Sequence, residues 1–469
     1  WHLFFQEVFD KGGFDIVIGN PPYIKEYTLK SAFDGLRESD YYQGKMDIWY
    51  FFGSFCLDLL KEKGVECFIA QNNWITSAGA SKFRTKVLEE TEIKIFTDFW
   101  NYKVFNSAGI QTMVYLLKKN QPEELYKLKY SVLKKDSLKK SHLVSFLDFN
   151  VKQSISEKNI LGFQASDYES KLITFNNPII SSVLNSILEN PNVFYLTDKE
   201  VANGIHPHHE VINKKMKAIM GKNVSIGDGI FGLSNEEFLS LNLESNEKEL
   251  VKPFYSNAAD LFKYFGRKIN DRHIIYTNSH FKNPNSMIDY PNLKKHLDKY
   301  QTVITSDNKP YGLHRARDEK FFISEKIVAQ RKCPNKPIFT YISFKSYFSA
   351  MFYLIKSDGV NLKYLTSILN SKLIAFWLRY KGKMQGDNFQ IDKAPLLSIP
   401  LLPSVNESLF IDLVDKILVL KGEDTSVFET QIDNMVYKLY NLTYEDVLVI
   451  EPNFLDRMSA EEYDVLKIE

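Results

Sequence analysis

The sequence predicts an α/β fold: part of an open sheet comes first, followed by a mixed α+β domain and a helical tail. Three observations support this. Strand-like and helical patterns alternate over residues 1–119, which is typical of a parallel sheet with crossover helices. A proline-bounded strand pattern lies at 395–403, and helical patterns at 411–420 and 431–439 close the chain. Its 469 residues suffice for two to three domains.

The first 119 residues contain the clearest succession of elements. Strands are expected at 14–19, 65–70, 94–99 and 112–118, helices at 45–63 and 81–90, and loops at 71–75 and 104–105. The first strand is short and apolar, and it runs directly into Asn20-Pro21-Pro22-Tyr23. In open α/β sheets, ligands bind at the carboxyl ends of the strands. The segment 20–23 is therefore the first candidate for a functional loop, although proline also marks ordinary loops after strands.

Further motifs follow this loop in a fixed order. They are Asp-Ile-Trp-Tyr at 47–50, Asn-Trp-Ile at 73–75 and Val-Phe at 104–105. Together with Asn20-Pro21-Pro22-Tyr23 they resemble the second half of the Taq-like DNA adenine methyltransferases, including the methyltransferase part of type IIG restriction–modification enzymes. The resemblance implies a partial Rossmann-like methyltransferase sheet in this region.

The resemblance makes Asn20, Pro21, Pro22 and Tyr23 the catalytic loop. The amino group of adenine is a poor nucleophile, because its lone pair is delocalised into the ring. The Asn20 side chain and the Pro21 carbonyl would each accept one amino hydrogen and so aim the lone pair at the methyl group. Two prolines hold these acceptors in place. Tyr23 offers a flat face to a flipped base.

Two other residues each have a functional and a structural interpretation. Phe105 matches the aromatic residue that packs on the flipped adenine opposite Tyr23, but it also reads as an ordinary core phenylalanine, one of 35 in the chain. Asp47 lies where the family has a polar residue at a helix start, and helix capping explains it nearly as well.

The resemblance also implies S-adenosylmethionine as the cofactor. The family binds it with a strand and a glycine-rich turn upstream of the catalytic loop, whereas only 19 residues precede Asn20. We therefore expect a fragment, or one piece of a split enzyme, that is inactive in isolation. Residues 227–232, Gly-Asp-Gly-Ile-Phe-Gly, fit the spacing of a dinucleotide-binding turn. A glycine-rich turn of the second domain, before a helix capped by Ser234 and Glu237, explains them better.

Nucleic acid is not suggested by the formal net charge of +1, but binding needs only a local basic face. Residues 309–345 carry nine basic and three acidic side chains with aromatic residues between them. A second group, Arg379, Lys381 and Lys383, precedes the loop 385–388. Arginine, lysine, asparagine and glutamine are the usual readers of phosphates and base edges, although a solvated face also explains such runs. The residues expected to bind DNA are Arg315, Arg317, Arg331, Lys332, Lys336, Lys381 and Lys383.

The later segments extend the resemblance. Segments 249–254, 326–328, 365–373 and 395–403 resemble the Taq-like target-recognition domain, and 411–445 resembles the closing part of type IIG proteins. Four parts are expected: 1–120, the methyltransferase half; 121–195, a connecting segment; 196–405, the target-recognition domain; and 406–469, the tail. Residues 127–140 form either a surface strand pair or a linker, and a helix is expected at 178–188.

Composition excludes other classes. No apolar run of about 18 residues is present, so no membrane span is expected. Cys56, Cys67 and Cys333 are not in metal-ligand spacing, which favours a reduced, cytoplasmic setting. His206, His208 and His209 lie within four residues. No second cluster completes a metal site there, so we expect an ordinary loop and no metal.

These observations favour a site-specific DNA methyltransferase acting on adenine N6, as a fragment of a type IIG-like restriction–modification protein. Its expected partners are double-stranded DNA and the missing N-terminal part or a companion subunit. Two alternatives stay open. One is a protein glutamine N-methyltransferase, because the same loop serves amide nitrogen. The other is a DNA-recognition module without activity.

Overall fold

The computed structural model describes residues 3–105, 110–151, 154–165, 173–175, 178–269, 271–385, 387–421 and 423–467. The chain divides into two compact units, Trp1–Ser182 and Val183–Glu469. Both contain helices and mixed sheets, so the expected combination of a partial α/β sheet, an α+β part and a helical tail is confirmed. The finer division into four parts stays a prediction.

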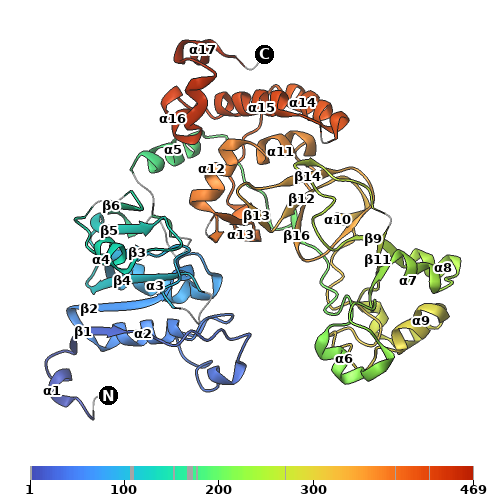
Figure 1. Ribbon diagram of the computed structural model, residues 1–469, viewed down its shortest axis with the longest axis horizontal. Coiled ribbons are helices and arrows are strands. Elements are labelled where there is room, and N and C mark those ends of the chain that lie inside the picture. Colours follow the sequence, from blue (N-terminus) through green and yellow to red (C-terminus); the bar gives the residue numbers. More distant parts are fainter. Residues whose placement is uncertain are drawn as a thin grey trace. The chain divides into compact units, whose positions relative to one another are not determined.

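Unit 1 is built on one six-stranded sheet with the order β1-β2-β4-β3-β5-β6 (Figure 1). Its elements are α1 (Gln6–Phe9), β1 (Phe14–Gly19), α2 (Trp49–Leu59), β2 (Leu60–Gln71), α3 (Ser81–Glu90), β3 (Thr91–Asp98), β4 (Thr112–Lys119), β5 (Tyr126–Leu133), α4 (Lys140–Leu147) and β6 (Ser156–Phe163). The last helix before unit 2 is α5 (Pro178–Leu188), which contains the boundary between the units.

The expectation of a parallel sheet is wrong for most strand pairs. Only β1 with β2 and β3 with β5 are parallel, whereas β4 runs antiparallel to both of its neighbours, and β5 is antiparallel to β6. The physical reason lies in the connections. No helix separates β3 from β4 among the described residues, and a chain that returns without a crossover forms an antiparallel pair.

Aromatic packing covers one face of this sheet. Trp49 of α2 lies edge-on to Phe83 of α3, with ring centroids 5.3 Å apart, and Phe83 lies 5.2 Å from Trp74. All three side chains are buried, as is Tyr115 of β4 beneath them. Helix α2 is shorter than the expected 45–63: Lys45 adopts a left-handed φ of 54°, and the backbone becomes extended at Leu60.

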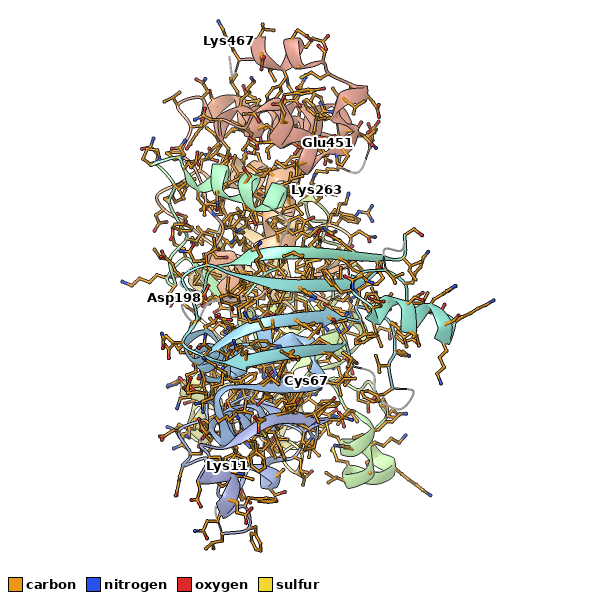
Figure 2. All side chains as sticks on the ribbon, turned by 90° about the vertical axis from the view of Figure 1, so that its left-hand side faces the viewer. Lys11, Cys67, Asp198, Lys263, Glu451 and Lys467 are labelled. Carbon is orange, nitrogen blue, oxygen red and sulfur yellow. The ribbon has the colours of Figure 1, made fainter. Side chains whose placement is uncertain are left out.

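The opposite face of the sheet is less covered near β1. Ile16 and Ile18 are 64% and 78% exposed. They pair in register with Val65 and Cys67 of β2, which are only half-buried. Figure 2 looks onto this sheet from a second direction, with Cys67 labelled on β2. Among the described residues β1 is also an edge strand. An edge strand with exposed apolar side chains is a surface that proteins ordinarily cover.

Unit 2 contains three further sheets. Their orders are β10-β14-β12-β16-β7, β15-β9-β11-β8 and β13-β18-β17. The strands are β7 (Val201–Asn203), β8 (Gly232–Ser234), β9 (Val251–Tyr255), β10 (Tyr264–Phe265), β11 (Arg272–Ile275), β12 (Lys326–Gln330), β13 (Lys332–Pro334), β14 (Phe339–Ile342), β15 (Tyr347–Phe348), β16 (Phe352–Ile355), β17 (Met384–Gln385) and β18 (Asn388–Gln390).

The helices of unit 2 fall into two groups. The first is α6 (Lys214–Met220), α7 (Asn235–Ser240), α8 (Ser245–Glu249), α9 (Pro291–Asp298) and α10 (Lys320–Ile323). The second is α11 (Leu362–Leu369), α12 (Lys372–Lys381), α13 (Lys393–Leu397), α14 (Glu407–Leu420), α15 (Ser426–Leu439), α16 (Tyr444–Ile450) and α17 (Ala460–Val465). No helix among the described residues combines the length and apolar character needed to cross a bilayer.

The tail helices pack onto the rest of unit 2 through specific bonds. Tyr440 donates its hydroxyl hydrogen to the Pro400 carbonyl at 2.8 Å, and Asp433 of α15 accepts a hydrogen bond from the Lys372 backbone N–H at 2.8 Å. The strand expected at 395–403 is wrong, because α13 includes residues 393–397 and only Leu401 forms a bridge, with Phe194. Proline is compatible with the first turn of a helix, which explains how Pro395 fits within α13.

The glycine-rich segment 227–232 is a turn and not a cofactor loop. Gly227 has a φ of 100°, a conformation that favours glycine. The turn leads into β8 at the edge of an antiparallel arrangement with β11, and α7 starts after that strand. A dinucleotide-binding turn instead joins a parallel strand directly to a helix. The expected Ser234–Glu237 capping box is present.

Candidate active site and nucleic-acid interface

The carboxyl ends of three strands define one edge of the unit 1 sheet. Strands β1 and β2 are parallel, and β2 and β3 both run antiparallel to β4, so all three point the same way. Their ends lead into Asn20, Asn72 and the segment that contains Phe105. At this edge Asn72 donates to both carboxylate oxygens of Asp98, at 3.1 and 3.2 Å. The arrangement places the predicted catalytic loop where α/β sheets bind ligands.

The Asn20–Tyr23 loop is anchored at its second half. Pro21 is buried and Asn20 is exposed. The Tyr23 hydroxyl lies 2.6 Å from Asn20 Oδ1 and 2.8 Å from the carbonyl oxygen of Ile69 on β2. A phenol has one hydrogen, so it donates to one of these oxygens at a time. Burial, with a smaller contribution from Asp47, raises the pKa of Tyr23 to about 12, which keeps the hydroxyl protonated at neutral pH.

Asp47 holds the chain directly after this loop. Its Oδ1 accepts a hydrogen bond from the Ile24 backbone N–H at 3.0 Å and a longer one from Trp49 at 3.4 Å. The carboxylate is buried, which raises its pKa above the ordinary range, and Oδ2 has no hydrogen-bond partner among the described residues. Its shorter bond goes to the loop, and α2 has no side-chain cap, so Asp47 supports the loop more than the helix.

The rings of Phe105 and Tyr23 lie close to each other. Their ring centroids are 6.5 Å apart, with the planes tilted by 49°. A base held between two rings would need about 7–8 Å between them, because each face-to-face contact requires ~3.5–4.0 Å. A small widening would therefore produce a slot of the right size. Phe105 is half-buried and is not part of the tightly packed aromatic core.

The predicted DNA-binding residues of unit 2 separate into two groups. Arg331 donates to Asp392 Oδ1 from Nε at 3.1 Å and from a terminal nitrogen at 2.6 Å, and also to the Ala350 carbonyl at 3.1 Å. Lys383 lies 3.4 Å from the same carboxylate. Arg317 donates to the Gly204 carbonyl at 3.2 Å and to Asn203 at 3.3 Å. All three side chains are therefore engaged in contacts within the protein and contribute to the fold.

The other predicted contacts are more open. Arg315, Lys332 and Lys336 are exposed, whereas Lys381 is half-buried near the end of α12. Gly386 of the neighbouring loop lies outside the described residues. Sequence reasoning missed Asp392, which holds two of the basic side chains. A carboxylate 61 residues away from Arg331 gives no local signal of this pairing.

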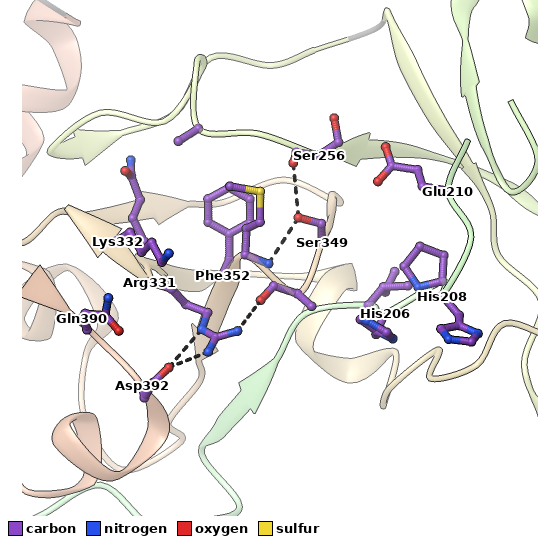
Figure 3. A pocket seen from close by; sticks show the side chains of 16 residues that line it. His206, His208, Glu210, Ser256, Arg331, Lys332, Ser349, Phe352, Gln390 and Asp392 are labelled. Atoms are coloured by element: carbon purple, nitrogen blue, oxygen red, sulfur yellow. Dashed lines mark hydrogen bonds and ion pairs between the residues drawn. The ribbon is translucent and has the colours of Figure 1, made fainter. Parts of the chain in front are cut away.

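A pocket of about 540 Å³ brings part of this set together. Arg331, Lys332, Gln390 and Asp392 line one side, and the segment 205–208 lines another. Figure 3 shows the Arg331–Asp392 pair on one side of this pocket and His206 and His208 on the other side. Among the residues with described positions, no group of three or more His, Cys, Asp or Glu side chains has a geometry that would hold a metal ion.

Comparison with known proteins identifies two regions. Residues 1–105 match the Eco57I restriction-modification methylase family, and residues 262–401 match the TaqI-like C-terminal specificity domain. The first match contains Asn20–Tyr23 and Phe105, and the second contains all the predicted DNA-binding residues. In both regions the chain is similar to restriction–modification DNA methyltransferases, and the expected resemblance is thereby confirmed.

Individual relatives are distant but extensive. The chain is 21% identical to the type II methyltransferase M.HindII of Haemophilus influenzae, over 84% of this chain and 75% of that protein. It is 22% identical to M.BstVI of Geobacillus stearothermophilus, over 93% of this chain and 75% of that protein. The solved structure of the type IIL restriction-modification enzyme MmeI in complex with DNA aligns with a TM-score of 0.59 and 11% identity. That alignment covers 96% of this chain and 57% of MmeI, and it shows a shared fold.

Proposed function

We propose that this chain carries the acceptor loop and the target-recognition part of a DNA methyltransferase that modifies adenine N6. The observation that carries the proposal is the exposed Asn20 amide at the carboxyl end of β1, beside the Tyr23 and Phe105 rings. The family match and the TaqI-like specificity domain support DNA as the substrate. Relatives named as type II methyltransferases support methyl transfer.

The loop would activate the amino group by accepting its hydrogens. Asn20 Oδ1 has two lone pairs, so it can accept from Tyr23 and from the substrate together. The Pro21 carbonyl would accept the second amino hydrogen. Both acceptors favour a tetrahedral nitrogen, with its lone pair available for attack, and that geometry is reached only during methyl transfer.

Base flipping is part of this proposal. A base inside a duplex cannot reach a loop at the edge of a sheet, so enzymes of this kind extrude it. The 6.5 Å separation of the Tyr23 and Phe105 rings supports a slot that would stack on both faces of the extruded adenine. The three free cysteines, Cys56, Cys67 and Cys333, fit a reducing compartment, and a cytoplasmic location belongs to the proposal.

The cofactor fit is incomplete in this chain. S-adenosylmethionine would supply the methyl group. Among the described residues, however, the glycine-rich turn at 227–232, which fits the spacing of a cofactor turn, leads into an antiparallel sheet. The exposed Ile16 and Ile18 on the free edge of β1 support the proposal that further chain covers this edge in the complete enzyme. A companion subunit would serve the same purpose.

The experiment is product analysis. The complete enzyme is incubated with duplex DNA and the methyl donor, the DNA is digested to nucleosides, and the products are separated by mass. N6-methyladenine is the expected product, and the isolated 469-residue chain is expected to form none. Methylcytosine, or methyl groups found only on protein, would contradict the proposal. Sequence-selective DNA binding without any product would favour the recognition-module alternative.

A further inference from the structure

Four histidines of unit 2 gather at one place. His206, His208 and His209 follow β7, and His314 joins them from more than one hundred residues away. Backbone hydrogen bonds between His206 and Arg315, at 3.0 and 3.1 Å, bring the two segments together. The His314 ring centroid lies 5.5 Å from that of His206 and 5.1 Å from that of His208, and the His208 and His209 rings stack at 4.3 Å.

Two of the rings are held by one shared hydroxyl group. The Thr305 hydroxyl bridges His208 Nδ1, at 3.0 Å, and His209 Nε2, at 2.8 Å. His208 has a φ of 71°, a conformation that few residues other than glycine adopt. His206 and His208 are both exposed and line the pocket described above.

The charges around the cluster are mainly positive. Arg315 follows His314 directly and Arg317 lies two residues further along, and both act on His206 electrostatically. The facing acids are Asp307, which lies 3.3 Å from His314 Nδ1 and is 83% exposed, and Glu210 on the pocket wall. Across the pocket, Lys332 stands beside the Arg331–Asp392 pair. Arg315 makes no ion pair among the described residues.

The clustered histidine rings are difficult to protonate when no anion is bound beside them. Partial desolvation beside the neighbouring rings, followed by repulsion from the other histidines, lowers the pKa of His206 and of His209 below the ordinary value; His206 still keeps an exposed edge. Protonation of these clustered rings would therefore destabilise the folded chain, because the charged histidines repel one another. An anion placed among them would convert the repulsion into attraction, because it would pair with each ring that gains a proton.

We propose that the cluster of His206, His208, His209 and His314, together with Arg315, binds the phosphate backbone of duplex DNA and takes up protons when it does so. The inference rests on the proposed function in one respect, namely that DNA is the ligand of unit 2. The histidines at 206–209 lie outside the region matched by the specificity-domain family.

Linkage gives the direction of the effect. A bound phosphate raises the pKa of each histidine that contacts it, so the complex holds more protons than the free chain near and below neutrality. Affinity for DNA therefore rises as pH falls. Each proton taken up corresponds to an increase of about ten-fold per pH unit over the range in which it is bound.

The experiment measures binding of a fluorescent duplex to the 469-residue chain by anisotropy, at constant ionic strength, between about pH 8 and pH 5.5. The test variant combines His206→Gln, His208→Gln and His314→Gln. The matched control is His280→Gln, an exposed histidine outside the cluster. We expect affinity to rise at least ten-fold toward acid in the wild type and in the control, and to stay nearly flat in the triple variant.

The outcomes separate this inference from the proposed function. Equal pH dependence in the wild type and the triple variant overturns the inference alone. Failure of the wild type to bind duplex at any pH overturns DNA recognition itself. Inorganic phosphate at matched ionic strength is the remaining arm: if it removes the acid increment in the wild type, free phosphate competes with the duplex for the cluster, which supports the assignment. If the triple variant does not fold, His208→Asn carries the test, because asparagine tolerates a positive φ.

Discussion

At the scale of single residues, the acceptor loop depends on one phenolic hydroxyl. The Tyr23 hydroxyl lies within hydrogen-bond distance of Asn20 Oδ1 and of the Ile69 carbonyl on β2, and its single hydrogen holds the amide whenever it is donated to Asn20. Its ring and its hydroxyl therefore have separable tasks. The ring faces Phe105, whereas the hydroxyl orients Asn20.

Tyr23→Phe keeps the ring and removes the hydroxyl. In the complete enzyme we expect kcat to fall about ten-fold, which corresponds to one hydrogen bond of ~1–1.5 kcal/mol, while DNA affinity stays nearly unchanged. Tyr23→Leu should also weaken binding of the extruded base, because it removes the stacking surface. Steady-state kinetics measures both effects, with Tyr102→Phe as the control. Equal kcat values for the wild type and Tyr23→Phe would remove the orienting role.

At the scale of elements, β2 carries an unusual buried acid. Glu66 is fully buried, with Oε1 accepting from the Tyr115 hydroxyl at 2.5 Å and Oε2 without a hydrogen-bond partner among the described residues. Burial raises its pKa from 4.5 to about 8. The folded state therefore holds a proton that the unfolded state releases between these values.

This proton makes stability fall as pH rises. Between about pH 4.5 and pH 8 the folded chain binds more protons than the unfolded chain, so the free energy of unfolding decreases with pH. Glu66→Gln should remove that slope. The free energy of unfolding of the variant minus that of the wild type should increase by on the order of a few kcal/mol between pH 5 and pH 8. Urea titrations at both pH values measure this, and the exposed Glu89→Gln serves as control. A pH-independent difference would mean that Glu66 titrates normally.

Elements were predictable where the signal was local. Strands 14–19 and 112–118 and the helices at 81–90 and 178–188 follow from apolar periodicity, and the structure contains them with nearly these bounds. Strand direction was not predictable, because it depends on which strands lie side by side. The 127–140 segment shows the same limit. Its alternating lysines indicated a surface strand or a linker, and β5 became a member of the main sheet by pairing with β3 and β6.

At the scale of the whole molecule, the basic residues of unit 2 divide into structural and available groups. Sequence reasoning placed Arg315, Arg317, Arg331 and Lys332 together as one surface. The hydrogen bonds from Arg331 to Asp392 and from Arg317 to the Gly204 carbonyl could not be predicted, because these partners are distant along the chain. The same limit hid the approach of His314 to the histidines at 206–209.

This division gives a prediction for DNA binding. Arg315→Ala and Lys332→Ala should each reduce the slope of log affinity against log salt by about 0.9, with little change in Tm. Arg331→Ala should lower Tm by about 2–4 °C, because it leaves Asp392 with only the longer contact to Lys383. Salt titrations and thermal melts of the isolated chain measure these effects. If Arg315→Ala and Lys332→Ala leave the slope unchanged, the surface is merely solvated.

The central claim is that Asn20 activates the amino group of adenine, and single-turnover methyl transfer by the complete enzyme tests it most directly. Asn20→Ala should reduce the rate by about 10²–10³-fold, because the lost acceptor acts mainly in the transition state. DNA affinity should remain close to that of the wild type, since the unit 2 contacts are untouched. An Asn20→Ala enzyme that transfers methyl groups at a near-normal rate would contradict the mechanism.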